Sequence, residues 1–479
     1  MWSPPVSLCS ASQETSFAYE STVKRWPTIL TGVIDQLATL NGNLLGEDDK
    51  DKLAESKEII QSIAGLIYEM RHDRVLPALP DVGLPSDTSS YNSLLTSFSS
   101  TNTNKWFTAS WLYAECYMYR RLRTLFAATK HWHLFDPFQT QKMDAFRSSA
   151  TGIMQLAKTM QELVKRGKPK DEELKAEWSG IMSTCLWGNA TDLSLLTSLT
   201  HEDIQALQSV ERGSDFILKN DLPQVWDHIK DLKQSRIDIV LDNSGFELYT
   251  DFVLADWLIT LSPFCSTVVF HPKLIPWFVS DVQPHDFKTT ISSLLDPEFF
   301  PANAGSTEEE KAALKTMVER WQRYVEEGRF KLSVPLELKM GDKGGELADF
   351  WTTAHPFSDL PEIAPALLTD LQKASLVIFK FVSPLSPVNP FFSHSILSSS
   401  LRGDLNYRKL TSDANWPTTT PFEDTLGPLK GKISILSLRT CKADVCVGLE
   451  EGKKEELDEK DPSWRVSGKY AVVSFSKKE

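Results

Sequence analysis

The sequence predicts an α/β protein in which an N-terminal helical domain packs on a C-terminal three-layer α/β/α domain with a mostly parallel sheet. From about Ser16 to Lys230, long apolar patterns recur at helical spacing without strand-like alternation. From Arg236 onward, short apolar runs alternate with helical segments. Strands that alternate with helices are typical of a parallel sheet covered by helices on both faces. The expected domains are therefore residues 1–230 and 231–479.

The individual elements follow from periodicity. Long helical patterns occupy Thr22–Leu40, Asp49–His72, Tyr91–Thr124 and Gln139–Lys165. Short apolar runs predict strands at Ile237–Leu241, Thr267–Phe270, Leu376–Phe379, Ile433–Leu438 and Tyr470–Phe475. The active cleft is expected between the two domains, where ligand pockets often form.

One helical stretch carries an aromatic and apolar stripe. Its members fall near one helix face: Trp111, Leu112, Cys116, Tyr119 and Leu122. Such a stripe could line a ligand site or the interior of a helix bundle. We favour the interior, because aromatic side chains dominate protein cores.

Composition excludes several classes of protein. The formal net charge of −13 disfavours a general affinity for nucleic acid, which binds mainly to basic surfaces. The six cysteines form no CxxC pair and are typical of free thiols in a reducing compartment. No apolar run approaches the roughly 20 residues that span a bilayer. We therefore expect no membrane or nucleic-acid partner and a location in the cytoplasm. A monomeric state and the nucleus as a second location are further expectations.

The turn after the first predicted strand of the C-terminal domain is the most informative feature. Asp242 and Asn243 follow the apolar run Ile237–Leu241 and precede a helical pattern that begins near Phe246. Ligands of open α/β sheets gather at the carboxyl ends of strands, and hard oxygen atoms suit Mg²⁺ or Mn²⁺. The alternative is that Asp-Asn-Ser-Gly only makes a turn, because Asn and Gly tolerate positive φ.

Further motifs occur in order along the chain. They are SFAYESTVKRWPTIL, WLYAECYMYRRL, CLWGN, DNSGFELYTDFVLADWLI, IPWFVSD, GDLNYRKL and RTCK. Together they resemble the metal-dependent damage-control phosphatases, a family first described as a domain of unknown function. RTCK at Arg439–Lys442 matches the RTxK signature of subfamily III, which includes proteins known as acidic-residue methyltransferases and sugar phosphate phosphatases. The resemblance spans nearly the whole chain and implies hydrolysis of phosphate esters of small metabolites, such as fructose 1-phosphate.

The same resemblance implies a metal site. It identifies Asp242, Asn243 and Asp281 as ligands of a divalent cation, with Mn²⁺, Mg²⁺, Ni²⁺ and Co²⁺ as the expected cofactors. Two carboxylates and a carboxamide leave coordination positions for water and a substrate phosphate. The alternative for Asp281 is that Ser280 or Asp281 caps the helix that follows.

The basic motifs supply the expected phosphate partners. Lys442, as a catalytic residue, and Arg439 follow a predicted strand, and Arg can grip a phosphate with two parallel N–H bonds. Lys273 is a further candidate. The GDLNYR motif contributes the remaining expected substrate-binding residues, which are Asp404, Leu405, Asn406, Tyr407 and Arg408.

Two other pairs remain open between a functional and a structural role. Asn189 and Asp192 resemble a GN-x-x-D element that faces the site, but they could equally form a helix N-cap. Glu247 and Asp251 are four residues apart and share a helix face. Either could act as the general acid or base, or both could be a solvated pair.

The stretch Phe381–Arg402 is out of keeping with its surroundings. Its 22 residues include seven serines and three prolines, and Arg402 is its only formal charge. In the resembled subfamily, the preceding strand runs straight into GDLNYRK. The stretch is therefore interpreted either as a retained intron or an error of the gene model, or as a lineage-specific loop.

The rival function is a methyltransferase that uses S-adenosylmethionine to modify protein glutamate residues. Such an enzyme usually has a Gly-rich turn after its first strand, whereas the turn here begins with Asp242 and suits a metal. A scaffold protein with an inactive site is disfavoured, because every expected ligand is present.

Overall fold

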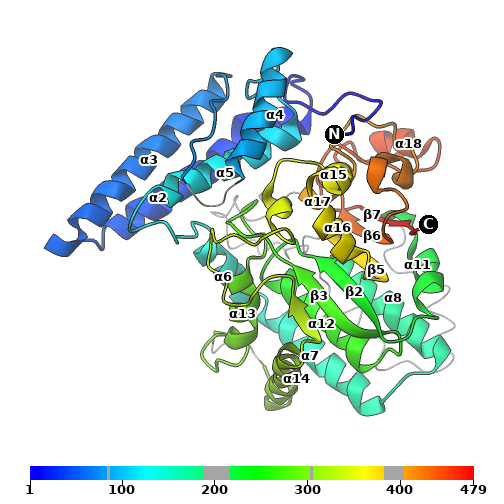
Figure 1. The fold of residues 1–479 in the computed structure, drawn as a ribbon. Coiled ribbons are helices and arrows are strands. Elements are labelled where there is room, and N and C mark those ends of the chain that lie inside the picture. The colour runs from blue at the N-terminus through cyan, green and yellow to red at the C-terminus, as the bar shows by residue number, and fades with distance from the viewer. Residues whose placement is uncertain (83–86, 188–215, 302–305, 382–403) are drawn as a thin grey trace.

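The computed structural model describes residues 1–82, 87–187, 216–301, 306–381 and 404–479. Asn189, Asp192 and most of the atypical stretch therefore lie outside the described residues. Figure 1 shows a group of long helices standing beside a sheet that has helices on both faces. The predicted fold class is confirmed.

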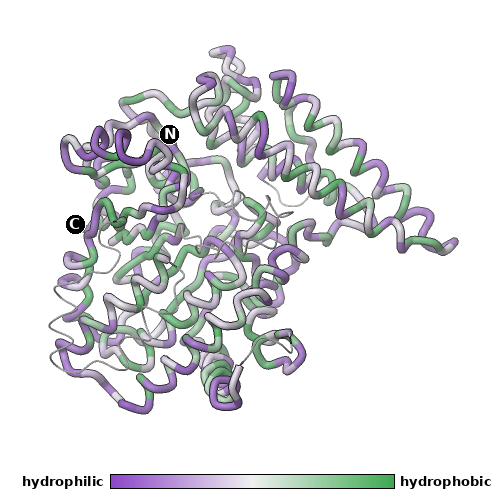
Figure 2. Tube along the Cα trace, turned by 180° about the vertical axis from the view of Figure 1, so that it is seen from behind, coloured by the Kyte–Doolittle hydropathy of each residue, from purple (hydrophilic) through white to green (hydrophobic). Residues whose placement is uncertain are grey.

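The N-terminal part is helical, as predicted. Its elements are α1 (Phe17–Glu20), the π-helical turn η1 (Ser21–Arg25), α2 (Trp26–Asn41), η2 (Glu47–Asp49), α3 (Lys50–Arg71), α4 (Thr88–Ser100) and α5 (Trp111–Ala127). Figure 2 shows polar and apolar turns alternating along the long helices, because each buries one stripe. On α3, for example, Ile59, Ile63, Leu66 and Met70 are buried at helical spacing. The aromatic stripe of α5 is also buried, which confirms the predicted interior.

Seven strands form one sheet in the order β1-β7-β6-β5-β2-β3-β4. They are β1 (Ile217–Asn220), β2 (Ser235–Val240), β3 (Cys265–His271), β4 (Phe330–Leu332), β5 (Leu376–Phe381), β6 (Ile435–Thr440) and β7 (Ala471–Ser476). All neighbouring strands are parallel except β6 and β7. The five predicted strands are confirmed, while the short edge strands β1 and β4 are additional.

Helices cover one face of this sheet around α12 (Phe246–Thr260). Phe252 of α12 packs on Phe270 of β3, with ring centroids 5.6 Å apart. The neighbouring elements are α6 (Gln139–Arg147), α7 (Ala150–Arg166), α8 (Asp171–Trp187), α13 (Pro284–Ser293) and α14 (Glu308–Glu326). Because α12 is buried almost all round, its sequence shows little amphipathic pattern.

Shorter elements cover the opposite face. Trp351 lies 5.5 Å from His271 of β3, and Phe357 lies 5.3 Å from Phe379 of β5, measured between ring centroids. The elements in this part are η5 (Asp349–Thr352), η6 (Phe357–Asp359), α15 (Leu360–Ile363), α16 (Pro365–Leu371), α17 (Leu405–Leu410) and η7 (Phe422–Leu429), with α11 (Leu222–Ile229) and α18 (Lys453–Lys460) near the sheet edge. The three-layer arrangement is complete.

Two hydrophobic cores position the site. The larger includes buried side chains from Phe146 onward and therefore groups α7, α8, β1 and α11 with the sheet. The second gathers the N-terminal helices together with Ile275–Val279, Leu405 and Ala443. Segments that carry predicted site residues are thus anchored in the helical core. The boundary at residue 230 stays a prediction.

The structure also bears on the cysteines and on membrane-spanning helices. All six cysteines are free, as predicted, and the structure shows that all are buried. Within the described ranges, no helix combines the length and apolar character needed to cross a membrane.

Candidate active site

The predicted metal ligands meet where β2 and β3 separate. Beyond Val240 of β2 and His271 of β3, the segment Ser280–Val282 lies between the backbone segments that follow these two strands. The Val282 N–H donates to the Asp242 carbonyl at 2.8 Å, and the Lys273 N–H donates to the Val282 carbonyl at 2.8 Å. An isolated antiparallel bridge pairs Asn243 with Asp281. The backbone therefore brings together two residues that are 38 positions apart in the sequence.

Side-chain hydrogen bonds continue this arrangement. The Asn243 amide nitrogen donates to Asp242 Oδ2 at 2.8 Å and to Glu247 Oε2 at 2.7 Å. The Ser280 hydroxyl donates to Asn243 Oδ1. Because both groups of Asn243 are engaged, its side chain is fixed between Asp242 and Ser280.

Asp281 is not a helix cap. Helix α13 begins at Pro284, and Gln283 with Asp286 forms its capping box. The alternative that Ser280 or Asp281 caps this helix is wrong, since the N-cap is Gln283, two positions after Asp281. The carboxylate of Asp281 is instead available to the site.

The two carboxylates are costly to ionise without a partner cation. Asp242 and Asp281 are each 2% exposed. Burial, reinforced by the charges of Asp281 and Glu247, raises the pKa of Asp242 well above its ordinary value. Burial also raises the pKa of Asp281 to about 7, although Lys273 opposes the shift. Like charges and desolvation both disfavour the charged form.

The donor set fits a hard divalent cation. Asp281 Oδ2 has no hydrogen-bond partner among the described residues, and the ammonium of Lys273 lies 3.7 Å away. The carboxylate and carboxamide oxygens of Asp242, Asn243 and Asp281 are ligands that Mg²⁺ and Mn²⁺ accept. Over the described ranges, no group of three or more His, Cys, Asp or Glu side chains is placed to hold a metal ion. A cation here would use two carboxylates and the carboxamide.

Lys273 and Asn406 tie α17 to the strand ends. The Lys273 ammonium donates to the Leu241 carbonyl at 2.9 Å and to Asn406 Oδ1 at 3.3 Å. The Asn406 amide nitrogen donates to the Lys380 carbonyl at 3.1 Å. Burial lowers the pKa of Lys273. Asn406 therefore positions the GDLNYR segment.

The guanidinium of Arg439 is fixed by its neighbours in an orientation that could bind an anion. Its guanidinium donates to Asp404 Oδ2 through Nε at 2.8 Å and lies above the Tyr407 ring, 4.1 Å from the centroid. Its Nη2 donates to the Ala443 carbonyl at 3.0 Å. Arg439 Nη1 and Asp404 Oδ1 are buried and have no hydrogen-bond partner in the described chain. One donor and one acceptor thus remain for a polar ligand.

Tyr407 and Leu405 support this cluster and are buried. The Tyr407 hydroxyl accepts a hydrogen bond from the Val447 N–H at 3.2 Å. Leu405 packs into the helical core. The predicted role of these two side chains in substrate binding stays a prediction, and their observed contacts are with the protein.

Arg408 links the two halves of the molecule. It donates to Glu115 of α5 at 2.5 Å and to Asp413 at 2.8 Å, and it lies 3.6 Å from the Trp111 ring centroid. Glu115 also accepts a hydrogen bond from the Trp26 indole at 2.9 Å. This network favours a positioning role for Arg408 over direct contact with phosphate.

Replacing Glu115 with alanine is expected to lower the free energy of unfolding by about 3–5 kcal/mol, because Arg408 would be left as a buried charge with one carboxylate partner fewer. Chemical denaturation measures the change. Glu58→Ala is the control, since Glu58 is exposed on α3. Equal stability of the two variants would show that the network contributes little.

Glu247 and Asp251 have different environments. Glu247 lies against Asn243 at the site, whereas Asp251 pairs with the Lys380 ammonium at 2.8 Å. Both are buried, at 3% and 0% exposure, so the solvated-pair alternative is wrong. Glu247 is the better candidate for an acid or base, because Asp251 is committed to an ion pair.

Lys442 is half-buried and lies two positions after the end of β6. A Cβ atom on Gly468 would lie 2.8 Å from Lys442 Cε, and Gly468 has a φ of +73°. A side chain at position 468 would therefore collide with Lys442 and strain the backbone. Gly468 leaves the space along which Lys442 extends.

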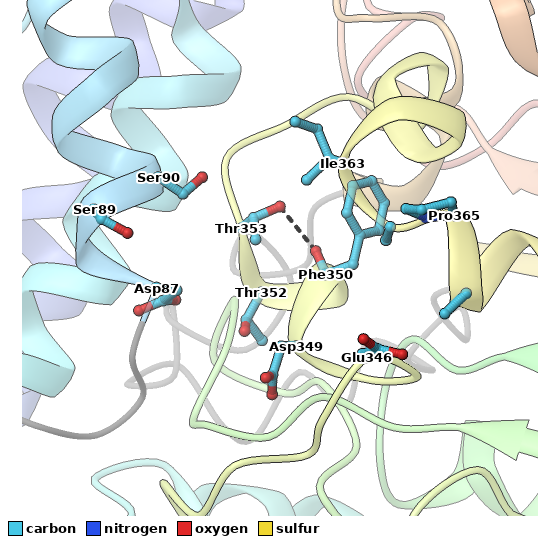
Figure 3. Close-up of a pocket in the computed structure, with 12 residues that line it drawn as sticks. Asp87, Ser89, Ser90, Glu346, Asp349, Phe350, Thr352, Thr353, Ile363 and Pro365 are labelled. Atoms are coloured by element: carbon cyan, nitrogen blue, oxygen red, sulfur yellow. Dashed lines mark hydrogen bonds between the residues drawn. The ribbon is translucent and has the colours of Figure 1, made fainter.

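A cavity of about 280 Å³ lies elsewhere, between α4 and the η5–α16 region (Figure 3). Its wall includes the carboxylates of Asp87, Glu346 and Asp349 and the hydroxyls of Ser89 and Ser90. None of the predicted site residues lines it. It is therefore separate from the candidate active site.

Comparison with known proteins places the chain in a family. The sequence model described as "Damage-control phosphatase ARMT1-like domain" matches residues 21–380 and 400–457. The chain belongs to this family, and its class is that of a damage-control phosphatase. The interval from 381 to 399 is left out of the match, and it falls within the atypical stretch.

Relatives agree over nearly the full length. Proteins named "Damage-control phosphatase ARMT1" are 36% identical in Xenopus tropicalis, over 99% of both chains, and 32% identical in Homo sapiens, over 98% of both. A solved "duf89 family protein" from Pyrococcus horikoshii covers 81% of this chain and 90% of its own, with 13% identity and a TM-score of 0.33.

Deleting residues 381–402 is expected to preserve folding. The Asn406 side chain already hydrogen-bonds to the Lys380 carbonyl, so the two ends of the interval are held together. A short connection is usual in α/β units. Thermal unfolding and phosphatase activity of the deletion variant test this expectation, and transcript sequencing distinguishes a retained intron from a loop. An insoluble variant, with transcripts that encode the stretch, would contradict it.

Proposed function

We propose that the protein is a metal-dependent phosphoric monoester hydrolase that acts on small phosphorylated metabolites. Sugar phosphates such as fructose 1-phosphate are the proposed substrates. The observation that supports this most is the antiparallel bridge between Asn243 and Asp281, which brings the buried carboxylate of Asp281 to the same place as the buried carboxylate of Asp242, to which Asn243 donates a hydrogen bond. Ionised, such a pair needs a cation. The names of the relatives favour a phosphatase over other metal-dependent enzymes.

In this proposal, different residues bind the metal and the phosphate. Asp242, Asn243 and Asp281 would hold the cation, which neutralises charge and polarises the phosphoryl group when bound. Arg439, oriented by Asp404, offers its remaining N–H donor to a phosphate oxygen. Lys442 adds a positive charge after the same strand. Such positioning and charge stabilisation provide most of the catalysis in phosphoryl transfer.

Glu247 is the proposed general base. Its carboxylate accepts a hydrogen bond from Asn243 and lies close enough to Asp242 to raise the pKa of that group. From there it can accept the proton of an attacking water. A covalent route through an aspartate nucleophile is the alternative, and incorporation of solvent oxygen into phosphate in a single turnover distinguishes the two.

The rival methyltransferase function has less support. The turn after β2 presents buried acidic side chains instead of the Gly-rich backbone that usually cradles a nucleotide-like cofactor. A panel of phosphate esters, assayed with and without divalent metals and beside a methyl-transfer assay, tests both functions. We expect metal-dependent phosphate release. Methyl incorporation without phosphate release would overturn the proposal.

A further inference from the structure

Three tyrosines of α5 differ in what their hydroxyls contact. The Tyr113 hydroxyl donates to the Tyr91 carbonyl at 3.0 Å, and the Tyr117 hydroxyl donates to the Pro77 carbonyl at 2.6 Å. Tyr119 is 1% exposed, and its hydroxyl is buried without a hydrogen-bond partner in the described chain. Among the tyrosines that the structure describes, it is the one buried hydroxyl without a hydrogen bond. Buried polar groups are nearly always paired, so this exception requires an explanation.

Tyr119 lies against the turn that carries Asp281. Its ring stacks on the Phe278 ring with centroids 4.7 Å apart and an interplanar angle of 28°, and the Trp277 ring is 6.0 Å away. The Asp281 N–H donates to the Trp277 carbonyl at 3.1 Å, which closes that turn. Phe278 has a φ of +43°, an uncommon conformation for an aromatic residue. A rigid helix therefore holds a phenol beside the proposed metal site.

Two carboxylates and one guanidinium act on the Tyr119 hydroxyl. Burial raises the pKa of Tyr119, and the carboxylates of Glu115 and Asp281 act in the same direction, so the group stays protonated and can donate. The guanidinium of Arg25 is close enough to oppose this shift. Arg25 ends the π-helical turn η1, and single π-helical turns are frequent at functional sites. A donor hydroxyl and a guanidinium therefore lie near each other beside the proposed metal site.

We propose that the Tyr119 hydroxyl donates a hydrogen bond to the phosphate of the bound substrate. It would approach from the helical half, whereas Arg439 approaches from the sheet. This inference rests on the proposed phosphatase function. Tyr119 is thus a phosphate-binding residue in a stripe whose other members are core.

Binding of inorganic phosphate to the full-length, Mg²⁺-loaded protein tests the inference. Tyr119→Phe removes the hydroxyl alone and keeps the stacked ring. Isothermal titration should show phosphate binding weakened about tenfold or more, the loss typical of one hydrogen bond to a charged group. Binding of Mg²⁺ alone should stay unchanged, and the variant should unfold at the same or a higher temperature, since no internal hydrogen bond is lost.

Tyr117→Phe is the matched control on the same helix. It should lower the unfolding temperature, because it leaves the Pro77 carbonyl without its donor, and it should leave phosphate affinity unchanged. Equal phosphate affinity of wild type and Tyr119→Phe would overturn the inference while the proposed function stands. Failure of the wild type to bind phosphate in the presence of Mg²⁺ would overturn both.

Discussion

Replacing Asp242 with alanine is expected to reduce kcat/KM for phosphate esters at least about a thousandfold, on the order of 4 kcal/mol of transition-state stabilisation. Asp242 provides one of the two carboxylates of the proposed metal site and accepts a hydrogen bond from Asn243. Without it, the cation would retain one charged ligand. Steady-state kinetics and metal titration of the same preparation measure the two effects together.

The same replacement should not lower the stability of the metal-free protein near neutral pH, although it lowers activity. The pKa of Asp242 is raised in the folded protein, so the folded state holds the proton more tightly than the unfolded state. Stability is therefore lost as pH rises through the unfolded value of about 4 toward the folded value. Near neutral pH, the metal-free alanine variant should unfold at an equal or higher temperature. A variant that is inactive because it is unfolded would contradict this account.

Replacing Lys442 with alanine is the second large effect. We expect a loss of about 2–4 kcal/mol in transition-state stabilisation, by analogy with the removal of one donor from an oxyanion site. The unfolding temperature should change little, because Lys442 is half-buried and its chain lies along Gly468. The measurement is kcat/KM on a phosphate ester together with thermal unfolding.

Lys469→Ala is the control for this prediction. Lys469 follows Gly468, which lies against Lys442, and the side chain of Lys469 is 51% exposed. The Lys469→Ala variant should retain normal turnover of the phosphate ester. If Lys442→Ala also keeps a near-normal kcat/KM, the RTCK segment has a structural role only.

The sheet could be predicted from sequence where its strands are buried. Continuous apolar runs indicated β2, β3, β5, β6 and β7. Strands β1 and β4 were missed, because each is an edge strand of three or four residues that includes a lysine. The predicted helix Tyr91–Thr124 is broken at residues 101–110, where Asn102 takes a φ of +56°. Helical periodicity continues across such a turn and does not reveal it.

The residues of the candidate site were proposed from the sequence, and their metal-binding role stays a prediction, but most of their geometry could not be predicted. The resemblance identified Asp242, Asn243 and Asp281, yet the backbone insertion that joins them depends on how β2 and β3 separate. Nothing in the sequence distinguishes Glu247 from Asp251, since their difference arises from the distant Lys380.

Long-range contacts also bear on Arg408, whose role in substrate binding stays a prediction. Its motif suggested a phosphate donor, and its carboxylate partner Glu115 is 293 residues away in the sequence. The same holds for Tyr119. The sequence pattern of a core tyrosine is the same as that of a ligand-binding tyrosine, and only the hydrogen-bond partner of each hydroxyl distinguishes them.

The most direct test of the central claim is phosphate release after removal of metal. The purified chain should be exhaustively treated with a chelator, freed of it, and assayed on fructose 1-phosphate and a generic aryl phosphate, with and without added Mg²⁺ or Mn²⁺. The site formed by Asp242, Asn243 and Asp281 predicts that turnover disappears on chelation and returns with the cation. Full activity in the chelated protein would contradict the assignment.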